Sequence, residues 1–320
     1  DDLKELAKRG DWERCLQVAT KQGGDAVDQY VILHAASLLR GNQLEDAVHV
    51  LNQHGTPLGP SNLQLYRQIA RDLLGRGRAS SVPDGVWLPA VQELREVLFK
   101  IWSAMRGGAG TEAADMREFD RLLHCTHYLC IHATCRAKGG PFTEIAQSAS
   151  VALVRYCDIL PADRVFYEAG QACKNSGKLN QAFVLTNRFI DLSELMDEGG
   201  DDVGSLENSD FEGTDVPFEF HLQDTQFLPE REREEVRDWV LTLSMDQKVE
   251  PVLQTRACYK CSAKVYEASL VCGSCQARFK PCVVTGMPVG RGRGELAPDE
   301  VFVNFHNGGQ FKDYVEFVLR

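Results

Sequence analysis

The amino-acid sequence predicts a mainly α protein, in which an α-solenoid of helix hairpins precedes a small α+β cysteine-rich module. A helix-turn-helix pattern recurs along the chain, helical apolar periodicity continues between the copies, and two Cys-x-x-Cys pairs stand near the C-terminus. We therefore expect four parts: helical repeats over residues 1–196, an acidic flexible linker over 197–228, an amphipathic helix and connection packing on the module over 229–256, and the module over 257–320.

The recurring pattern is a helix hairpin whose turn contains Gly10, Asn42 or Gly177. A bulky residue follows each turn by two positions and a small residue by five. The small residue lets two helix backbones approach, and the bulky one fills the groove between them. These pairs are Trp12 and Cys15, Leu44 and Ala47, and Leu179 and Ala182. The pattern resembles tetratricopeptide (TPR) repeats, because the first two copies lie about 32 residues apart.

Further helices are expected where apolar residues recur at helical spacing between clusters of Gly, Pro and Ser. They cover residues 63–74, 87–105, 116–137, 142–160, 162–173 and 229–245. Within the module, residues 300–305 alternate as in a strand, and 311–318 have the pattern of a closing helix.

No catalytic residue is predicted. The sequence contains no evident Ser-His-Asp arrangement, phosphate-binding glycine loop or spaced carboxylate pair. A group of potential ligands on one helix projects in several directions, so we interpret its members as packed side chains. These are Cys125, His127, Cys130, His132 and Cys135.

The charge distribution separates the end of the chain from the rest. The net charge of −11 argues against nucleic-acid binding through the whole surface, and no apolar run reaches the roughly 20 residues that span a bilayer. Residues 189–230 lack Lys and Arg, whereas residues 250–294 carry seven of them. We expect residues 197–215 to be a mobile, protease-sensitive linker. The alternative is an acidic arm that docks on the basic module.

The cysteine pairs predict a metal site. Each pair places two sulfurs on one side of a tight turn, and the connection of ten residues lets the two turns face each other. We expect one structural Zn²⁺ bound by Cys258, Cys261, Cys272 and Cys275, with Cys282 outside the site. Two disulfides or packed thiols are the alternative. Four cysteine ligands leave no position for water or substrate.

Residues 258–289 carry a resemblance to a known family. The sequence Cys-x-x-Cys, then Val-Cys-Gly-Ser-Cys and Phe-Lys-Pro-Cys-Val-Val-Thr-Gly-Met-Pro, resembles the C-terminal end of the large WD-repeat and TPR-repeat subunits of intraflagellar transport. The fragment is most similar to the largest subunits of the B complex. Because the sequence shows no signal peptide and no apolar run long enough to span a bilayer, we expect a soluble intracellular C-terminal fragment of something longer. The resemblance implies a scaffold needed for cilium assembly. Its partners would be other transport subunits, and its location the cilium, the ciliary base and the cytoplasm.

A second resemblance concerns the segment Cys282-Val-Val-Thr-Gly286, which is similar to the opening of U-box domains, the metal-free relatives of RING ubiquitin ligases. Leu296-Ala-Pro-Asp299 resembles the second U-box loop. In that family these loops form an apolar groove for a ubiquitin-conjugating enzyme, which implies weak ligase activity or ubiquitin binding. The implied contact residues are Val284 and Pro298, and the implied self-modification sites are Lys264 and Lys280. The alternative is a structural cap and protein-docking module with no ubiquitin role.

Overall fold

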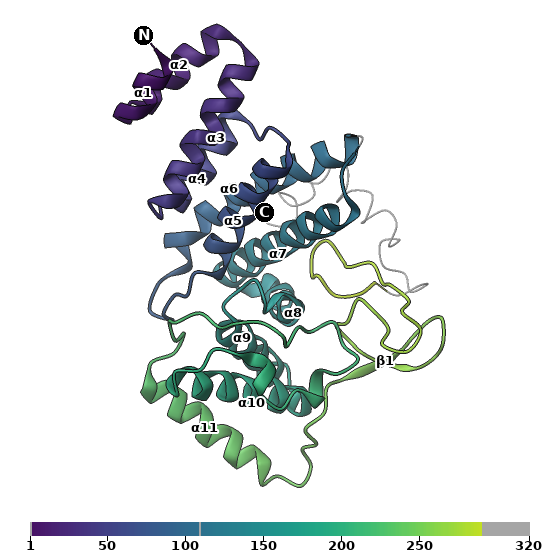
Figure 1. The fold of residues 1–320 in the computed structure, drawn as a ribbon. Coiled ribbons are helices and arrows are strands. Elements are labelled where there is room, and N and C mark those ends of the chain that lie inside the picture. Colours follow the sequence, from purple (N-terminus) through teal and green to yellow (C-terminus); the bar gives the residue numbers. More distant parts are fainter. Residues whose placement is uncertain (1, 109, 290–320) are drawn as a thin grey trace. The chain divides into compact units, whose positions relative to one another are not determined.

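The structure is a computed structural model that describes residues 2–108 and 110–289. The expected strand over 300–305, the expected helix over 311–318 and Pro298 lie outside the described residues. The chain forms two compact units: residues 1–74 with 85–127, and residues 75–84 with the part from Tyr128 onward. Most described residues are helical (Figure 1), which confirms the mainly α fold class.

The first unit consists of consecutive helices that pack on their neighbours, α1 on α2, α2 on α3 and α3 on α4. Their apolar stripes form its core, in which Ile69 and Leu98 are almost fully buried. Two carboxylates near the start of α7, Asp115 and Glu118, hold Arg67 at 2.8 and 2.6 Å. The helices are α1 (Leu3–Arg9), α2 (Trp12–Gln22), α3 (Gly24–Arg40), α4 (Leu44–His54), α5 (Pro60–Gly75), α6 (Asp84–Gly107) and the first part of α7 (Ala113–Lys138).

The three predicted hairpin turns have the same main-chain geometry. Gly10, Asn42 and Gly177 all adopt positive φ angles, of 74°, 54° and 76°. The next residue in each turn donates its N–H to a carbonyl five positions earlier, as in a Schellman motif. The small residues Cys15, Ala47 and Ala182 are fully buried, as the pattern predicts. The bulky positions differ more, because Leu44 is buried whereas Leu179 is 39% exposed.

In the second unit, α8 packs on α9, α9 on α10 and α10 on α11. The end of α7 joins this layer, where Ile131 and Cys135 pack against Ala146 and Ala149 of α8. The elements after α7 are η1 (Gly140–Phe142), α8 (Thr143–Leu153), η2 (Val154–Tyr156), α9 (Ala162–Asn175), α10 (Leu179–Asp197), η3 (Val203–Ser205), η4 (Ser209–Phe211), α11 (Glu230–Ser244), β1 (Thr255–Ala257) and β2 (Lys264–Tyr266). β1 and β2 pair antiparallel.

Helix α11 differs from its prediction in where it packs. Val236, Val240 and Leu243 are buried as the periodicity predicts, but α11 packs on α10, whereas we expected it to pack on the module. Lys174 of α9 places its ammonium 4.4 Å from the ring centroid of Trp239, and Arg237 lies 3.3 Å from Glu194. Lys174 and Glu194 belong to α9 and α10, so the pattern of α11 alone could not identify them as its partners.

Residues 197–228, here called the acidic strap, are not the exposed linker that their composition predicts. Val203, Phe211 and Val216 are almost completely buried. The Phe211 ring packs edge-on against Phe166 at 5.6 Å, under the guanidinium of Arg188 at 5.1 Å. The strap carries no cation of its own, but its acidic and aromatic residues meet cations of the helices. These remote partners explain why local composition gave the wrong expectation.

The end of the strap is fixed by one buried carboxylate. Asp163 of α9 accepts hydrogen bonds from the main-chain N–H of Phe227 at 2.8 Å and from the side chain of Gln223 at 2.7 Å. Burial raises the pKa of Asp163, although these hydrogen bonds act in the opposite direction. The strap is therefore held to α9 through a polar contact as well as through its aromatic residues.

We predict that a protease that cleaves before aspartate will cut the connection after α11 before it cuts the acidic strap. The connection over residues 245–254 is mostly exposed and includes Asp246, whereas the buried aromatic residues of the strap must leave their sites before cleavage. Timed digestion followed by mass spectrometry would show this order. First cleavage at Asp210 or Asp215 would instead restore the flexible-linker expectation.

Candidate metal centre

The two cysteine pairs lie on turns with matching hydrogen bonds. In the first turn, Cys258 donates its N–H to the carbonyl of Ala263, and its own carbonyl accepts from Ser262, both at 2.9 Å. In the second, Cys272 makes the corresponding bonds with Ala277 and Gln276 at 2.9 and 3.0 Å. The residue after each pair has positive φ, 61° at Ser262 and 59° at Gln276. This reversal points both sulfurs of a pair to the same side.

The turns bring the four predicted ligands together. The Sγ atoms of Cys258, Cys261, Cys272 and Cys275 all lie within 4.8 Å of one another. Two contacts across the pairs, Cys258 to Cys275 and Cys261 to Cys272, are each 3.7 Å. A tetrahedron with metal–sulfur bonds of about 2.3 Å has edges of about 3.8 Å, so this arrangement fits one tetrahedral ion. All four thiols are free, so the disulfide alternative does not describe this structure.

Backbone N–H groups stabilise the thiolate forms of Cys258 and Cys272. The backbone N–H of Cys261, followed by that of Lys260, lowers the pKa of Cys258 to about 6, although burial acts in the opposite direction. Backbone N–H groups of Cys275 and Ser274 likewise lower the pKa of Cys272. The Ala263 N–H also lowers the pKa of Cys261, but the neighbouring thiols outweigh it and raise that pKa to about 12. A bound cation would displace this remaining proton.

A small apolar cluster surrounds the sulfurs. Val265, Ala277 and Phe279 are buried against Cys258 and Cys272. The guanidinium of Arg256 lies 4.1 Å from the Phe279 ring centroid, and Tyr259 meets the same ring edge-on. The cluster has few apolar members, so a metal ion would supply much of the stability of this part of the module.

One buried arginine that the sequence analysis missed connects the module to the helices. Arg155 of η2 donates from Nη1 to the carbonyl of Gly286 at 2.9 Å and from Nη2 to that of Ala268 at 2.6 Å. Its Nε lies 3.4 Å from Asp215 of the strap. Tyr128 of α7 adds a bond from its hydroxyl to the carbonyl of Cys282, at 2.9 Å. An arginine inside an apolar run was the signal available in the sequence, but it did not identify these acceptors.

The other predicted site residues occupy different places. Val284 is half-buried, Lys264 and Lys280 are exposed, and Pro298 lies outside the described residues. Cys282 is not among the four cysteines that could hold a metal ion. The cysteine and histidine group on α7 is buried, which confirms its interpretation as packed side chains.

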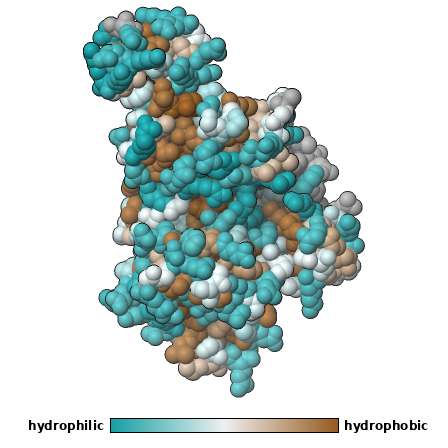
Figure 2. Space-filling view, in the orientation of Figure 1, coloured by the Kyte–Doolittle hydropathy of each residue, from teal (hydrophilic) through white to brown (hydrophobic). Residues whose placement is uncertain are grey.

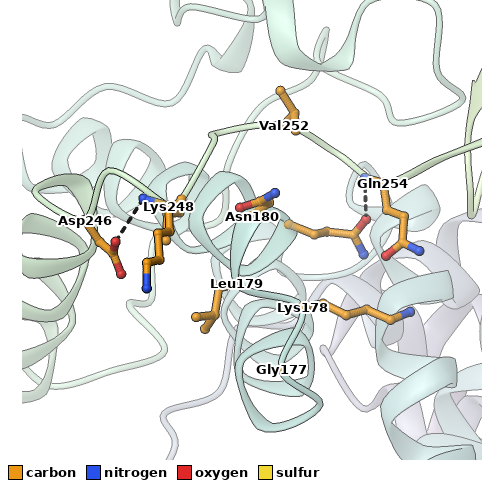
Figure 3. Close-up of a pocket in the computed structure, with 10 residues that line it drawn as sticks. Gly177, Lys178, Leu179, Asn180, Asp246, Lys248, Val252 and Gln254 are labelled. Carbon is orange, nitrogen blue, oxygen red and sulfur yellow. Dashed lines mark hydrogen bonds between the residues drawn. The ribbon is translucent and has the colours of Figure 1, made fainter.

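A pocket of about 560 Å³ lies between the start of α10 and the connection after α11. Leu179, Val252 and Lys248 are among its lining residues, and Gln254 donates its main-chain N–H to Gln181 beside it (Figure 3). Nearby apolar side chains reach solvent, including Val252 with 50% of its surface exposed. On the face drawn in Figure 2, apolar surface occurs in separate patches between hydrophilic areas. The pocket lining contains no arrangement with an evident catalytic role.

The chain has clear similarity to named proteins. It is 37% identical to the mouse intraflagellar transport protein 172 homolog over 305 residues, which are 95% of this chain and 17% of that protein. It is 34% identical to the Chlamydomonas reinhardtii intraflagellar transport protein 172 over 88% of this chain and 16% of that protein. It is 30% identical to the Caenorhabditis elegans intraflagellar transport protein osm-1 over 89% of this chain and 16% of that protein. The chain thus spans about a sixth of the length of these relatives.

No protein-family model matches the chain. Among the described helices, none combines the length and the apolar character needed to cross a membrane. The similarity nevertheless extends through the helical layers, the strap and the cysteine turns, since it covers nearly the whole sequence. We conclude that this chain is homologous to one segment of the intraflagellar transport protein 172 family.

Proposed function

We propose that this chain is a C-terminal segment of an intraflagellar transport subunit and acts as a scaffold for cilium assembly. Its similarity to relatives from mouse, alga and nematode, each named as an intraflagellar transport protein, carries this proposal. In this role the helix hairpins bind neighbouring transport subunits in the cilium, at the ciliary base and in the cytoplasm. The four-cysteine group would be a structural part of this scaffold.

The metal in this proposal is Zn²⁺ with a structural role. Four thiolates at the spacing observed here suit zinc, and they leave no coordination position for a substrate. Binding of the ion would order the turns that carry Cys258 and Cys272, because their few apolar neighbours cannot do so alone. The module would then serve as a folded end to the helical layer.

A chimera tests the scaffold proposal. In cells that lack their own intraflagellar transport protein 172, the matching segment of the mouse protein would be replaced by this chain. We expect the chimera to restore cilia, whereas the mouse protein without the segment should not. A Cys272→Ser chimera is the matched control for the metal centre. Cilia no longer than those given by the deletion would overturn the proposal.

A second candidate function is contact with ubiquitin or a ubiquitin-conjugating enzyme, as the U-box resemblance implies. One observation favours this function. Val284 is partly exposed, whereas the preceding residue Val283 is buried. Lys264 and Lys280 are exposed in the same module and are the proposed acceptors for self-modification. In this function the module positions a conjugating enzyme that carries ubiquitin, and it needs no nucleophile of its own.

The ubiquitin proposal is tested by incubating the chain with activating enzyme, a conjugating enzyme and ubiquitin. We expect conjugates that disappear in the variants Val284→Asp and Pro298→Asp, because an apolar contact loses affinity when a charge must be desolvated. Replacing both Lys264 and Lys280 by arginine should reduce self-modification alone. Equal conjugation by the wild type and both aspartate variants would mean that the transfer is non-specific. Absence of conjugates would favour the alternative, a structural cap and protein-docking module with no ubiquitin role.

A further inference from the structure

The module contains a turn that repeats the geometry of the two metal-binding turns without binding metal. Cys282 donates its N–H to the carbonyl of Met287, and its own carbonyl accepts from Gly286, both at 2.8 Å. Gly286 has a φ of 72°, in the same region as Ser262 and Gln276. Each of the three turns is flanked by an antiparallel pair seven residues apart, here Pro281 with Pro288. We call residues 282–287 the third turn.

The third turn lacks the second sulfur. Thr285 stands where the metal-binding turns have Cys261 and Cys275, and the sequence has no cysteine after Cys282. A hydroxyl is a harder and less acidic ligand than a thiolate, so this turn cannot contribute a zinc pair as the others do. Its fold must therefore be stabilised in another way.

The helices provide that stabilisation. The carbonyl of Cys282 accepts from the Tyr128 hydroxyl, and the carbonyl of Gly286 accepts from the fully buried guanidinium of Arg155. Both acceptors belong to the two residues that close the third turn through their own hydrogen bond. The helices thus bind the backbone of the turn and not a particular side chain.

Gly286 also indicates that the third turn packs closely on the helices. At the equivalent position the metal-binding turns carry Ser262 and Gln276, so the turn itself tolerates a side chain. A Cβ added at Gly286 would lie 2.8 Å from the Cβ of Ala152 and 3.2 Å from a ring carbon of Tyr128. Glycine is therefore required here by the close approach of α7 and α8, beyond its freedom to adopt a positive φ.

We infer that the third turn is a metal-free knuckle that docks the module on α7, α8 and η2 through Tyr128, Ala152 and Arg155. Docking on the helices stabilises the third turn, which lacks the second sulfur needed to bind a metal ion. The inference does not rest on the proposed transport or ubiquitin roles. It has a consequence for any partner of Val284, because such a partner must bind while the backbone of the same turn is held by the helices.

The variant Gly286→Asn tests this docking in the complete chain, since asparagine tolerates a positive φ but brings a Cβ against Ala152. We expect amide hydrogen exchange over residues 280–289 to accelerate about tenfold or more, while metal content stays at one ion per chain. The matched control is Gln276→Asn, which places the same residue at the exposed equivalent position. It should change neither quantity.

A milder variant keeps the test decisive if Gly286→Asn disturbs folding. Tyr128→Phe removes only the hydroxyl that binds Cys282, and we expect exchange over 280–289 to accelerate about threefold to tenfold. Unchanged exchange in both variants would overturn the docking. Loss of metal from a folded Gly286→Asn chain would also overturn it, because the third turn would then act as support for the metal centre.

Discussion

Replacing Cys272 by serine is expected to abolish metal binding and to unfold the two turns that carry the cysteine pairs. The apparent free energy of binding for structural zinc is about 10–16 kcal/mol in small domains, and it is available only to the folded state. Cys272 is fully buried and its Sγ lies 3.7 Å from that of Cys261, so serine would remove one of the four thiolates from the centre of the site. Hydrogen exchange should show loss of protection over residues 257–279, while α9, α10 and the third turn, which docks on the helices, remain protected.

The control for this variant is Cys282→Ser. Cys282 lies in a turn of the same shape but is not in the metal-binding group, so the variant should keep one ion per chain. Elemental analysis of both variants, purified without added metal, measures the metal content of each and shows which of the two cysteines is a ligand. Retention of metal by Cys272→Ser, or its loss from Cys282→Ser, would show that the four ligands are assigned wrongly.

The second large effect is expected from Arg155→Met. Methionine fills a similar volume but leaves the carbonyls of Gly286 and Ala268 without this donor, and Asp215 without its nearby cation. Removing one member of a buried ion pair typically costs about 3–5 kcal/mol. We expect the free energy of opening the module from the helices to fall by about this amount.

This free energy can be measured from exchange rates of slow amides in the module, which avoids treating a chain of two units as one transition. Arg278→Met is the matched control, because Arg278 belongs to the same module and is exposed. Its effect should stay within about 0.5 kcal/mol. A similarly small effect at Arg155 would mean that other contacts hold the module.

The features predicted correctly from the sequence are those with nearby partners. The hairpin turns at Gly10, Asn42 and Gly177 are closed by hydrogen bonds over five residues, so their signal is local. The convergence of the four cysteines also depends on residues close in sequence, since the contacts across the cysteine pairs join residues 17 and 11 positions apart. Spacing and residue type are sufficient in both cases. That these cysteines bind a metal stays a prediction.

The features that were missed depend on distant partners. Tyr128 and Cys282 are 154 positions apart, and Arg155 and Gly286 are 131 apart. The acidic strap has the composition of a disordered linker, yet Phe211 reaches a site formed by Phe166 and Arg188. No pattern within the strap or the third turn identifies these partners. The division of the chain at residues 196, 228 and 256 stays a prediction.

X-ray absorption at the zinc edge tests the metal centre most directly, since it reports the element and its ligands in the intact chain. Four sulfur atoms at about 2.3 Å from one zinc ion per chain are predicted, because four thiols converge within 4.8 Å. A spectrum with nitrogen or oxygen ligands in place of any sulfur, or a chain with less than about half an equivalent of zinc, would contradict the four-cysteine structural site.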